Sequence, residues 1–262
     1  MPGATSDFPL VPGADGTGTV VALGPGVTEF SEGDAVYAYG FLNPKGGFYA
    51  EYAAVPADQV ARVPEGLDLE RAVALPVTGV TALRGLDDTL RIGPGVRLLV
   101  FGAAGGVGYP AVQLAKAMGA HVLAVVSNGE AAALVRGAGA DVVVDGREDD
   151  LAGAIRAFAP DGLDAVLAVV NGHGLDTAIA AVRKGGRVAY PYGVQPAPRG
   201  RTGVEAVGYD GTPGRAVFDK LNALVESRPF HVHISGRFPL ADAAQAHRAL
   251  EDHHQGRIVL VV

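Results

Sequence analysis

The sequence predicts an α/β fold in which a doubly wound parallel sheet follows a smaller β-rich region. Short apolar runs alternate with helix-like segments between residues 96 and 193, and this alternation predicts βαβ units. Earlier in the chain, runs rich in Val and Thr are separated by Gly and Pro, which predicts short strands joined by tight turns. With 262 residues, 48% of them hydrophobic, the chain is long enough for one large domain or two small ones.

The first third of the chain is predicted to be mostly β structure. Strands are expected at 17–24, 34–40 and 46–55, the last with aromatic spacing. Asp68 is expected to cap the N-terminus of a helix over 69–75. A second helical segment follows at 80–90 and leads to a turn at 93–95.

Continuous apolar runs in the middle third indicate strands that are buried on both faces, as in a parallel sheet. These strands are expected at 96–102, 121–127, 141–145, 163–170 and 187–193. Helices are expected between them at 108–119, 130–139, 149–159 and 175–186, the last ending at a double glycine. Right-handed crossovers would place these helices on both faces of the sheet.

The last quarter of the chain leaves this alternation. We expect a loop at 194–214 that contains one strand at 203–209. Two helices at 215–227 and 241–252 and a final strand at 257–262 are expected after it. We predict that this part returns to the first domain. The chain is therefore divided into a β domain at 1–83, an α/β domain at 84–212, and a C-terminal segment at 213–262 that rejoins the first domain.

Composition excludes several classes of function. The net charge of −7 argues against a nucleic-acid-binding surface. The chain has no cysteine, which excludes disulfides, thiolate nucleophiles and Cys-ligated zinc. Among the seven histidines, His253 and His254 are adjacent, and His231 with His233 would form only half of a metal site. We therefore expect no metal.

The sequence also argues against a membrane protein. No apolar run reaches the roughly 18 residues that a membrane-spanning helix needs. The first ten residues, MPGATSDFPL, lack the charged head and apolar middle of a signal peptide. We expect a cytoplasmic protein.

A glycine-rich turn follows the first buried strand, in the segment VFGAAGGVGYPAVQLAKAMG. Strand, glycine turn and helix in this order form the context of a dinucleotide-binding fingerprint, here Ala103-x-Gly105-x-x-Gly108 with alanine in place of the first glycine. Gly105 would let a pyrophosphate approach the backbone, and Gly108 would let the helix pack close to the strand. The alternative is a tight turn of a doubly wound fold that binds no nucleotide at the point where the strand order reverses.

Cofactor contacts are predicted along the whole turn. The N–H groups of Gly106 and Val107 would point at the phosphate, aided by the positive end of the helix dipole. The cofactor-binding residues expected in the turn are Ala103, Ala104, Gly105, Gly106, Val107 and Gly108.

The end of the second buried strand indicates which dinucleotide binds. Chains that bind NAD place Asp or Glu near this point, on the ribose hydroxyls, whereas this strand ends at Ser127 and Asn128. Without a carboxylate, the 2′-phosphate of NADP is not repelled. We therefore expect NADPH rather than NADH, with Ser127 and Asn128 as contacts and Arg136 or Arg147 as the candidate phosphate partner.

These features resemble the medium-chain dehydrogenase/reductase superfamily, in its zinc-independent quinone oxidoreductase and enoyl reductase branch. The matching segments cover most of the chain and are FPLVPGADGTGTVVALGPGVTEFSEGDAVYAYG, GGFYAEYAAVPADQVARVPEGL, ALPVTGVTA, VFGAAGGVGYPAVQLAKAMGAHVLAVVS, GAGADVVVD and FPLADAAQAHRALEDHHQGRIVL. The resemblance implies a GroES-like β domain on the substrate side and a Rossmann domain. It also implies a homodimer, often formed by pairing Rossmann sheets edge to edge.

This sequence departs from the family in three respects. Without cysteine, both zinc sites of the alcohol dehydrogenase branch are absent, so zinc-assisted alcohol oxidation is not expected. Ala131 and Gly146 stand where family members often carry a Lys and a Tyr near the adenosine phosphate. Family members have an arm of several dozen residues before FPLVPG, whereas Met1 here falls just ahead of this segment, so either the true start lies upstream or the domain is trimmed. We expect an N-terminally short GroES-like domain whose open edges a partner subunit or a rearranged sheet covers.

The resemblance also implies contacts to the nicotinamide. Thr78, in LPVTGVTA, resembles a family threonine beside this ring; the alternative is a hydroxyl that bonds back to its own helix. Val170 and Asn171 end the fourth buried strand, and Gly193 and Val194 end the fifth. In the family, the loops at these two strand ends flank the nicotinamide.

The segment YGFLNPKGGFY approaches the substrate in the family. Tyr39 is the catalytic candidate, because its phenol would donate a proton or a hydrogen bond to a carbonyl oxygen as hydride arrives. The alternative is a tyrosine packed at the sheet surface. Asn43, Lys45 and Tyr49 surround the same loop, and Asp15 is expected to hold backbone N–H groups.

The leading hypothesis is an NADPH-dependent reductase that transfers hydride to a small quinone or α,β-unsaturated carbonyl. Two alternatives remain open. One is a nucleotide-binding module without catalysis, or a subunit completed by a partner. The other is a biosynthetic enzyme that uses the same cleft for a step without redox chemistry.

Overall fold

The N-terminal lobe is built on a three-stranded antiparallel sheet with the order β1-β2-β3. The structure, a computed structural model, describes residues 10–40, 46–250 and 256–262. The strands are β1 (Asp15–Thr19), β2 (Ala35–Tyr39) and β3 (Val60–Arg62), with the short 3₁₀ helix η1 (Ala57–Gln59) before β3. In this register Asp15 pairs with Tyr39, so two predicted site residues lie side by side at the edge of the lobe.

The segment 46–55 was expected to be a strand, and this expectation is wrong. Its first residues cross the chain at Val11–Gly13, and the N–H groups of Gly47 and Tyr49 donate to the carbonyl groups of Val11 and Pro12 at 2.8 and 2.9 Å. A Cβ at Gly47 would overlap the carbonyl oxygen of Pro12. The two backbones therefore meet in one close crossing, which leaves no room for a regular ladder along the segment.

Four short helical elements connect the two sheets. They are α1 (Leu69–Ala72), the π-helical turn η2 (Leu75–Gly79), α2 (Val80–Arg84) and the π-helical turn η3 (Gly85–Thr89). The predicted N-cap is confirmed, because the Asp68 carboxylate accepts the N–H of Arg71 at 2.8 Å. The helix start is thereby stabilised where the chain leaves the N-terminal lobe.

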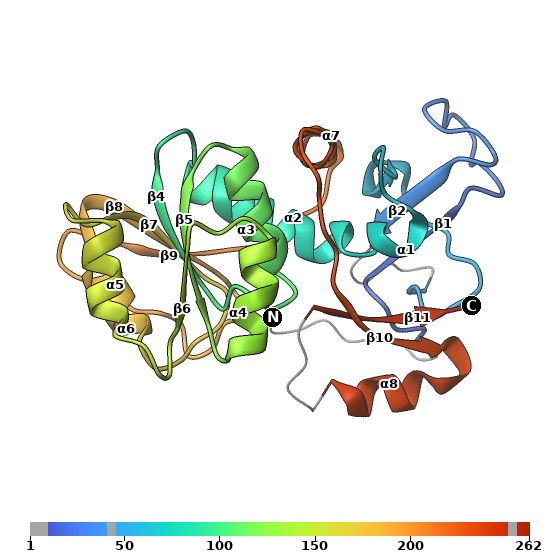
Figure 1. Cartoon of the computed structure of the whole chain (residues 1–262). Coiled ribbons are helices and arrows are strands. Elements are labelled where there is room, and N and C mark those ends of the chain that lie inside the picture. Colours follow the sequence, from blue (N-terminus) through green and yellow to red (C-terminus); the bar gives the residue numbers. More distant parts are fainter. Residues whose placement is uncertain (1–9, 41–45, 251–255) are drawn as a thin grey trace.

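A six-stranded parallel sheet forms the second lobe, with the order β6-β5-β4-β7-β8-β9. Its strands are β4 (Arg97–Phe101), β5 (His121–Val126), β6 (Val142–Asp145), β7 (Leu163–Ala168), β8 (Val182–Pro191) and β9 (Ala206–Tyr209). The helices are α3 (Gly108–Ala117), α4 (Gly129–Gly137), α5 (Leu151–Phe158) and α6 (Leu175–Ala180). Helices α5 and α6 cover one face of the sheet, while α2, α3 and α4 cover the other (Figure 1). The predicted doubly wound α/β fold is confirmed.

Alternating side chains of β4 pack against the helices on the two opposite faces of the sheet. Leu98 and Val100 belong to the core cluster that contains α3 and α4, whereas Leu99 and Phe101 belong to the cluster that contains α5 and α6. This explains why the strand is a continuous apolar run, because both of its faces are covered.

Helix α6 ends earlier than expected. The sequence predicted a helix through Gly186, but β8 begins at Val182, where it pairs with Leu163. A Cβ at Gly186 would lie 2.7 Å from the carbonyl oxygen of Asp164. The second glycine therefore permits close pairing of β7 and β8 at a register shift, and it does not cap the helix.

The C-terminal segment lies against both lobes. Its elements are α7 (Arg215–Glu226), β10 (Ile234–Pro239), η4 (Leu240–Asp242), α8 (Ala243–Ala249) and β11 (Arg257–Val261). Strands β10 and β11 form a separate parallel pair below the N-terminal lobe, and α8 packs on this pair (Figure 1). The division of the chain at residues 83 and 212 stays a prediction. Among the described residues, no helix combines the length and the apolar character that crossing a membrane requires.

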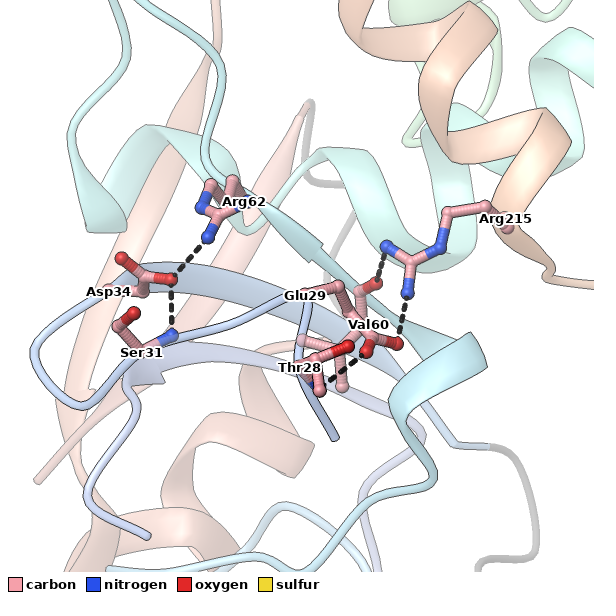
Figure 2. A network of polar contacts seen from close by, with 7 residues as sticks. All are labelled: Thr28, Glu29, Ser31, Asp34, Val60, Arg62 and Arg215. Atoms are coloured by element: carbon pink, nitrogen blue, oxygen red, sulfur yellow. Dashed lines mark hydrogen bonds and ion pairs between the residues drawn. The ribbon is translucent and has the colours of Figure 1, made fainter. Parts of the chain in front are cut away.

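A polar network attaches α7 to the N-terminal lobe. The buried ring of Phe30 lies between the guanidinium groups of Arg62 and Arg215, at 5.4 and 5.3 Å from the ring centroid. Arg62 forms an ion pair with Asp34 at 2.8 Å, and Arg215 forms one with Glu29 at 3.1 Å. Figure 2 shows both pairs. Arg215 is the first residue of α7, so these contacts hold the helix start to the sheet.

Candidate functional site

The candidate site lies where the order of the parallel strands reverses. From β4 the chain adds β5 and β6 on one side of the sheet and then crosses to β7 on the other. Phe101 of β4 pairs with Ala168 of β7, so the loops that follow these two strands leave the same edge of the sheet. Ligands bind at such switch points in open parallel sheets.

The glycine turn occupies this switch point. Gly102 takes the left-handed conformation, with φ +87°, directly after β4, so Gly102 makes the tight turn, one residue before Ala103, which was expected in the place of the first glycine. A Cβ at Gly108 would overlap the carbonyl oxygen of Gly102 and lie 2.8 Å from the Cα of Ala103. A Cβ at Gly105 would meet only the carbonyl oxygen of Gly102, at 3.5 Å. Gly108 therefore serves helix packing, while the space at Gly105 faces away from the protein.

The turn presents backbone donors to this space. Within the described ranges, the N–H groups of Gly106 and Val107 donate to no protein acceptor. The N–H of Ala103 instead donates to Val125 of β5 at 3.0 Å, and the carbonyl of Ala104 accepts the N–H of Gly256 at 3.3 Å. Free donors at the start of α3, a helix of 10 residues, form an anion-binding position.

The end of β5 carries polar groups without a carboxylate. Ser127 and Asn128 are both exposed, and Asn128 caps α4 by accepting the N–H of Ala131 at 2.8 Å. Arg147 follows β6 at the same edge, whereas Arg136 lies in the last turn of α4, about 12 Å further along the helix by its rise per residue. Arg147 is thus the better placed of the two candidate phosphate partners.

The departure from the family at Gly146 has a steric reason. A Cβ at this position would lie 2.9 Å from the Cγ1 of Val125. A side chain at this position therefore requires the side chain of Val125 to move.

The residues predicted beside the nicotinamide lie at the ends of β7 and β8. Asn171 donates its side-chain N–H to the carbonyl of Pro196 at 2.6 Å, which ties the two loops together. Val170 packs against Gly102, while Gly193 borders open space and Val194 is buried. The loops predicted to flank the ring therefore meet at the switch point.

Thr78 approaches the glycine turn from η2. Its hydroxyl donates to the carbonyl of Ala74 at 2.7 Å, which is the back-bonded geometry of the alternative interpretation. Its methyl carbon lies 3.5 Å from the position of a Cβ on Gly106. In this geometry Thr78 presents its apolar side to the turn.

An ion pair between Arg257 and Asp15, which was not predicted from the sequence, lies beside the glycine turn. Arg257, the first residue of β11, donates to the carboxylate of Asp15 at 2.9 Å, and its Cδ lies 3.9 Å from the position of a Cβ on Gly106. Among the described residues its Nε is buried without a hydrogen-bond partner. Asp15 also accepts the N–H of Val77 at 3.4 Å, in line with its expected role as an acceptor for the backbone.

No local pattern marks Arg257 in the sequence. It is an arginine after a glycine at the start of the final apolar run. Only the return of the C-terminal strand places it against a turn that lies about 150 positions earlier in the sequence, a separation that sequence periodicity does not encode.

Two tyrosines flank Asp15. Burial raises the pKa of Tyr39, and the charges of Asp15 and Asp210 raise it further. Burial and Asp15 also raise the pKa of Tyr49, against an opposing effect of Arg257. Both phenols therefore stay protonated at neutral pH and are hydrogen-bond donors. Asn43 and Lys45 lie outside the described residues.

The described ranges contain no group of three or more His, Asp or Glu side chains that could hold a metal ion.

Comparison with known proteins identifies the family. Residues 1–65 match the alcohol dehydrogenase GroES-like domain, and residues 106–199 match the zinc-binding dehydrogenase family. The chain is 34% identical over 265 residues to an NADPH-dependent alkenal/one oxidoreductase of Arabidopsis thaliana, covering 97% of this chain and 64% of that protein. It is 29% identical over 253 residues to a quinone oxidoreductase of Mus musculus, covering 92% and 76% of the two chains.

Solved structures agree with these matches. A mycobacterial protein complexed with NADPH has a TM-score of 0.83 and 32% identity, with 99% of this chain and 85% of that chain covered. An NAD-dependent alcohol dehydrogenase has a TM-score of 0.87 and 28% identity, with 98% and 84% covered. The chain belongs to the medium-chain dehydrogenase/reductase superfamily, in its quinone oxidoreductase branch. It spans less than two thirds of the length of the Arabidopsis relative.

The two glycines of the turn should respond differently to alanine. Gly108→Ala is expected to lower the free energy of unfolding by about 1–3 kcal/mol, because the new Cβ overlaps the backbone at Gly102. Gly105→Ala should change it by about 0.5 kcal/mol or less, because its Cβ makes only an ordinary contact. Urea denaturation of both variants measures the difference, and equal losses would contradict this account of the turn.

Proposed function

We propose that this protein is an NADPH-dependent oxidoreductase that transfers hydride to a quinone or to an α,β-unsaturated carbonyl compound. The observation that carries this proposal is the glycine turn at the switch point, where two backbone N–H groups have no acceptor among the described residues and the side chain of Arg257 passes close to Gly106. The similarity to an alkenal/one oxidoreductase and to quinone oxidoreductases supports the reaction class. Because the chain has no cysteine, the proposed reaction does not use cysteine-ligated zinc.

The residues of the turn fit a dinucleotide. A diphosphate bound over Gly105 would accept hydrogen bonds from the N–H groups of Gly106 and Val107, and the positive charge of Arg257 would attract it. The absence of a carboxylate at Ser127, together with Arg147 at the same edge, supports NADPH over NADH. A relative named as NADPH-dependent and a similar structure that holds NADPH agree with this choice.

Side chains around the cofactor position would orient the reactants. The nicotinamide supplies the hydride when bound. The methyl group of Thr78 and the loops at Asn171 and Val194 would exclude water from one side of the ring. Tyr39, whose pKa is raised by burial and by Asp15, would donate a hydrogen bond to the substrate oxygen that gains negative charge.

We also propose a homodimer formed through β9. This strand ends the six-stranded sheet, and no described strand pairs with its outer side. Val207 on β9 and Tyr192 beside it are exposed large side chains, at 39% and 57%. Light scattering should give the mass of two chains, and a monomer at micromolar concentration would contradict this assembly.

Cofactor binding and turnover test the proposed function directly. Titration should give tighter binding of NADPH than of NADH, and NADPH should be oxidised with at least one member of a panel of quinones and enones. Gly105→Ala should weaken NADPH binding by about tenfold or more, since 1.4 kcal/mol corresponds to a factor of ten and the new Cβ occupies the diphosphate position. Binding without turnover would favour a nucleotide-binding module, and turnover without cofactor consumption would favour a step without redox chemistry.

Arg257 should contribute to binding through its charge. Arg257→Gln is expected to weaken NADPH binding by about tenfold, because a hydrogen bond to a charged group contributes about 1.5–3 kcal/mol. The control is Arg237→Gln on the adjacent strand β10, where the arginine pairs with the exposed Glu70. Equal affinities of the Arg257 variant and this control would exclude a role for Arg257 in the cofactor site.

A further inference from the structure

Tyr49 and His247 form a hydrogen-bonded pair that the proposed cofactor site does not use. Tyr49 Oη and His247 Nε2 lie 3.0 Å apart, and the two ring centroids are 5.8 Å apart with the planes tilted by 58°. The residues are 198 positions apart in the sequence, so the pair exists only through the return of the C-terminal segment to the N-terminal lobe.

The position of Tyr49 is determined by the backbone crossing in the N-terminal lobe. Its N–H donates to the carbonyl of Pro12 at 2.9 Å, and its Cδ1 lies 2.8 Å from the position of a Cβ on Gly13. Gly13 precedes Asp15 by two residues. Tyr49 therefore lies against the chain just before Asp15, and the charges of Asp15 and Arg257 shift the pKa of its phenol in opposite directions, Asp15 upward and Arg257 downward.

His247 approaches the same point from α8. This helix packs on β10 and β11 (Figure 1), and Arg257 is the first residue of β11. His247 lies in the last turn of α8 and is exposed. The pair thus joins a half-buried phenol to an imidazole that is exposed to solvent.

Reduction of a conjugated double bond needs a proton as well as a hydride. A proton donor must be protonated at neutral pH and must recover its proton in each cycle. Burial and Asp15 raise the pKa of Tyr49, which keeps its phenol protonated. His247 connects this phenol to solvent.

We propose that Tyr49 is the proton donor of the reaction and that His247 is the positioning residue that returns a proton to it. This inference rests on the proposed function. When NADPH is bound, its nicotinamide C–H bond would break to leave NADP⁺, the hydride would form a C–H bond at the β-carbon, and the electron pair of the C=C bond would move to give an enolate. The O–H bond of Tyr49 breaks as its proton forms the new C–H bond at the α-carbon. The phenolate then takes the Nε2 proton of His247 while Nδ1 of the same ring takes a proton from solvent, so one solvent proton replaces the proton given to the substrate.

A cyclic nitroalkene separates the two steps, because hydride addition gives a nitronate that is stable enough to leave the protein and absorbs ultraviolet light. With the wild-type protein, NADPH oxidation and nitroalkane formation should proceed together. Tyr49→Phe should keep the rate of NADPH oxidation within about twofold while enzymatic nitroalkane formation falls about a hundredfold or more and nitronate accumulates. Tyr52→Phe is the matched control, because Tyr52 follows on the same segment and is 73% exposed.

His247→Gln should slow protonation less than Tyr49→Phe, by about tenfold, and should raise the solvent deuterium isotope effect on nitroalkane formation. NADPH binding and thermal unfolding of each variant should match the wild type. Three results would each overturn the inference. The first is protonation of the nitronate by Tyr49→Phe at the wild-type rate, and the second is nitronate accumulation with Tyr39→Phe instead. The third is that Tyr49→Phe loses cofactor binding and hydride transfer to the same extent as nitroalkane formation. A wild-type protein that oxidises no NADPH with any acceptor would overturn the proposed function and this inference together.

Discussion

The close approach of α3 to β4 is the constraint on which the candidate site depends. A Cβ at Gly108 would overlap the carbonyl oxygen of Gly102, so the helix reaches its position only with glycine at this residue. This contact brings the start of α3 to the edge where β4 and β7 diverge. Because the first N–H groups of a helix have no partner within the helix, the turn faces the switch point with free donors. The apolar packing of β4 against the layers on both faces holds this geometry in place.

The return of the C-terminal segment completes the site around this turn. The N–H of Gly256 bonds to Ala104, and Arg257 bonds to Asp15 at the start of β1. Residues from three distant parts of the chain therefore meet at one point. Asp15 balances the charge of Arg257, whose side chain is only 22% exposed, because a partly buried charge requires a partner. The same return brings His247 against Tyr49.

Elements with a strong pattern could be predicted from sequence, and elements without one could not. The buried parallel strands are continuous apolar runs, and α7 begins at Arg215 as expected. Strand β3 has three residues, and β10 contains Gly and Pro, so neither carries a usable period. The segment 46–55 has aromatic spacing typical of a strand, but its backbone crossing at Gly47 prevented one. At Gly186, a contact with β7 overrode a pattern typical of a helix end.

The sequence by itself determined the class of fold, the place of the glycine turn and the family resemblance, because each depends on residues that are close in the chain. Spacing alone was enough to single out Gly105 and Gly108, and the polar end of β5 at Ser127 could be found in the same way. Only the tertiary structure decided that Gly102 makes the tight turn, that Thr78 bonds back to Ala74, and that Arg257 and Tyr49 border the site. Contacts between residues far apart in the sequence depend on how sheets and helices pack, and local periodicity does not predict that packing.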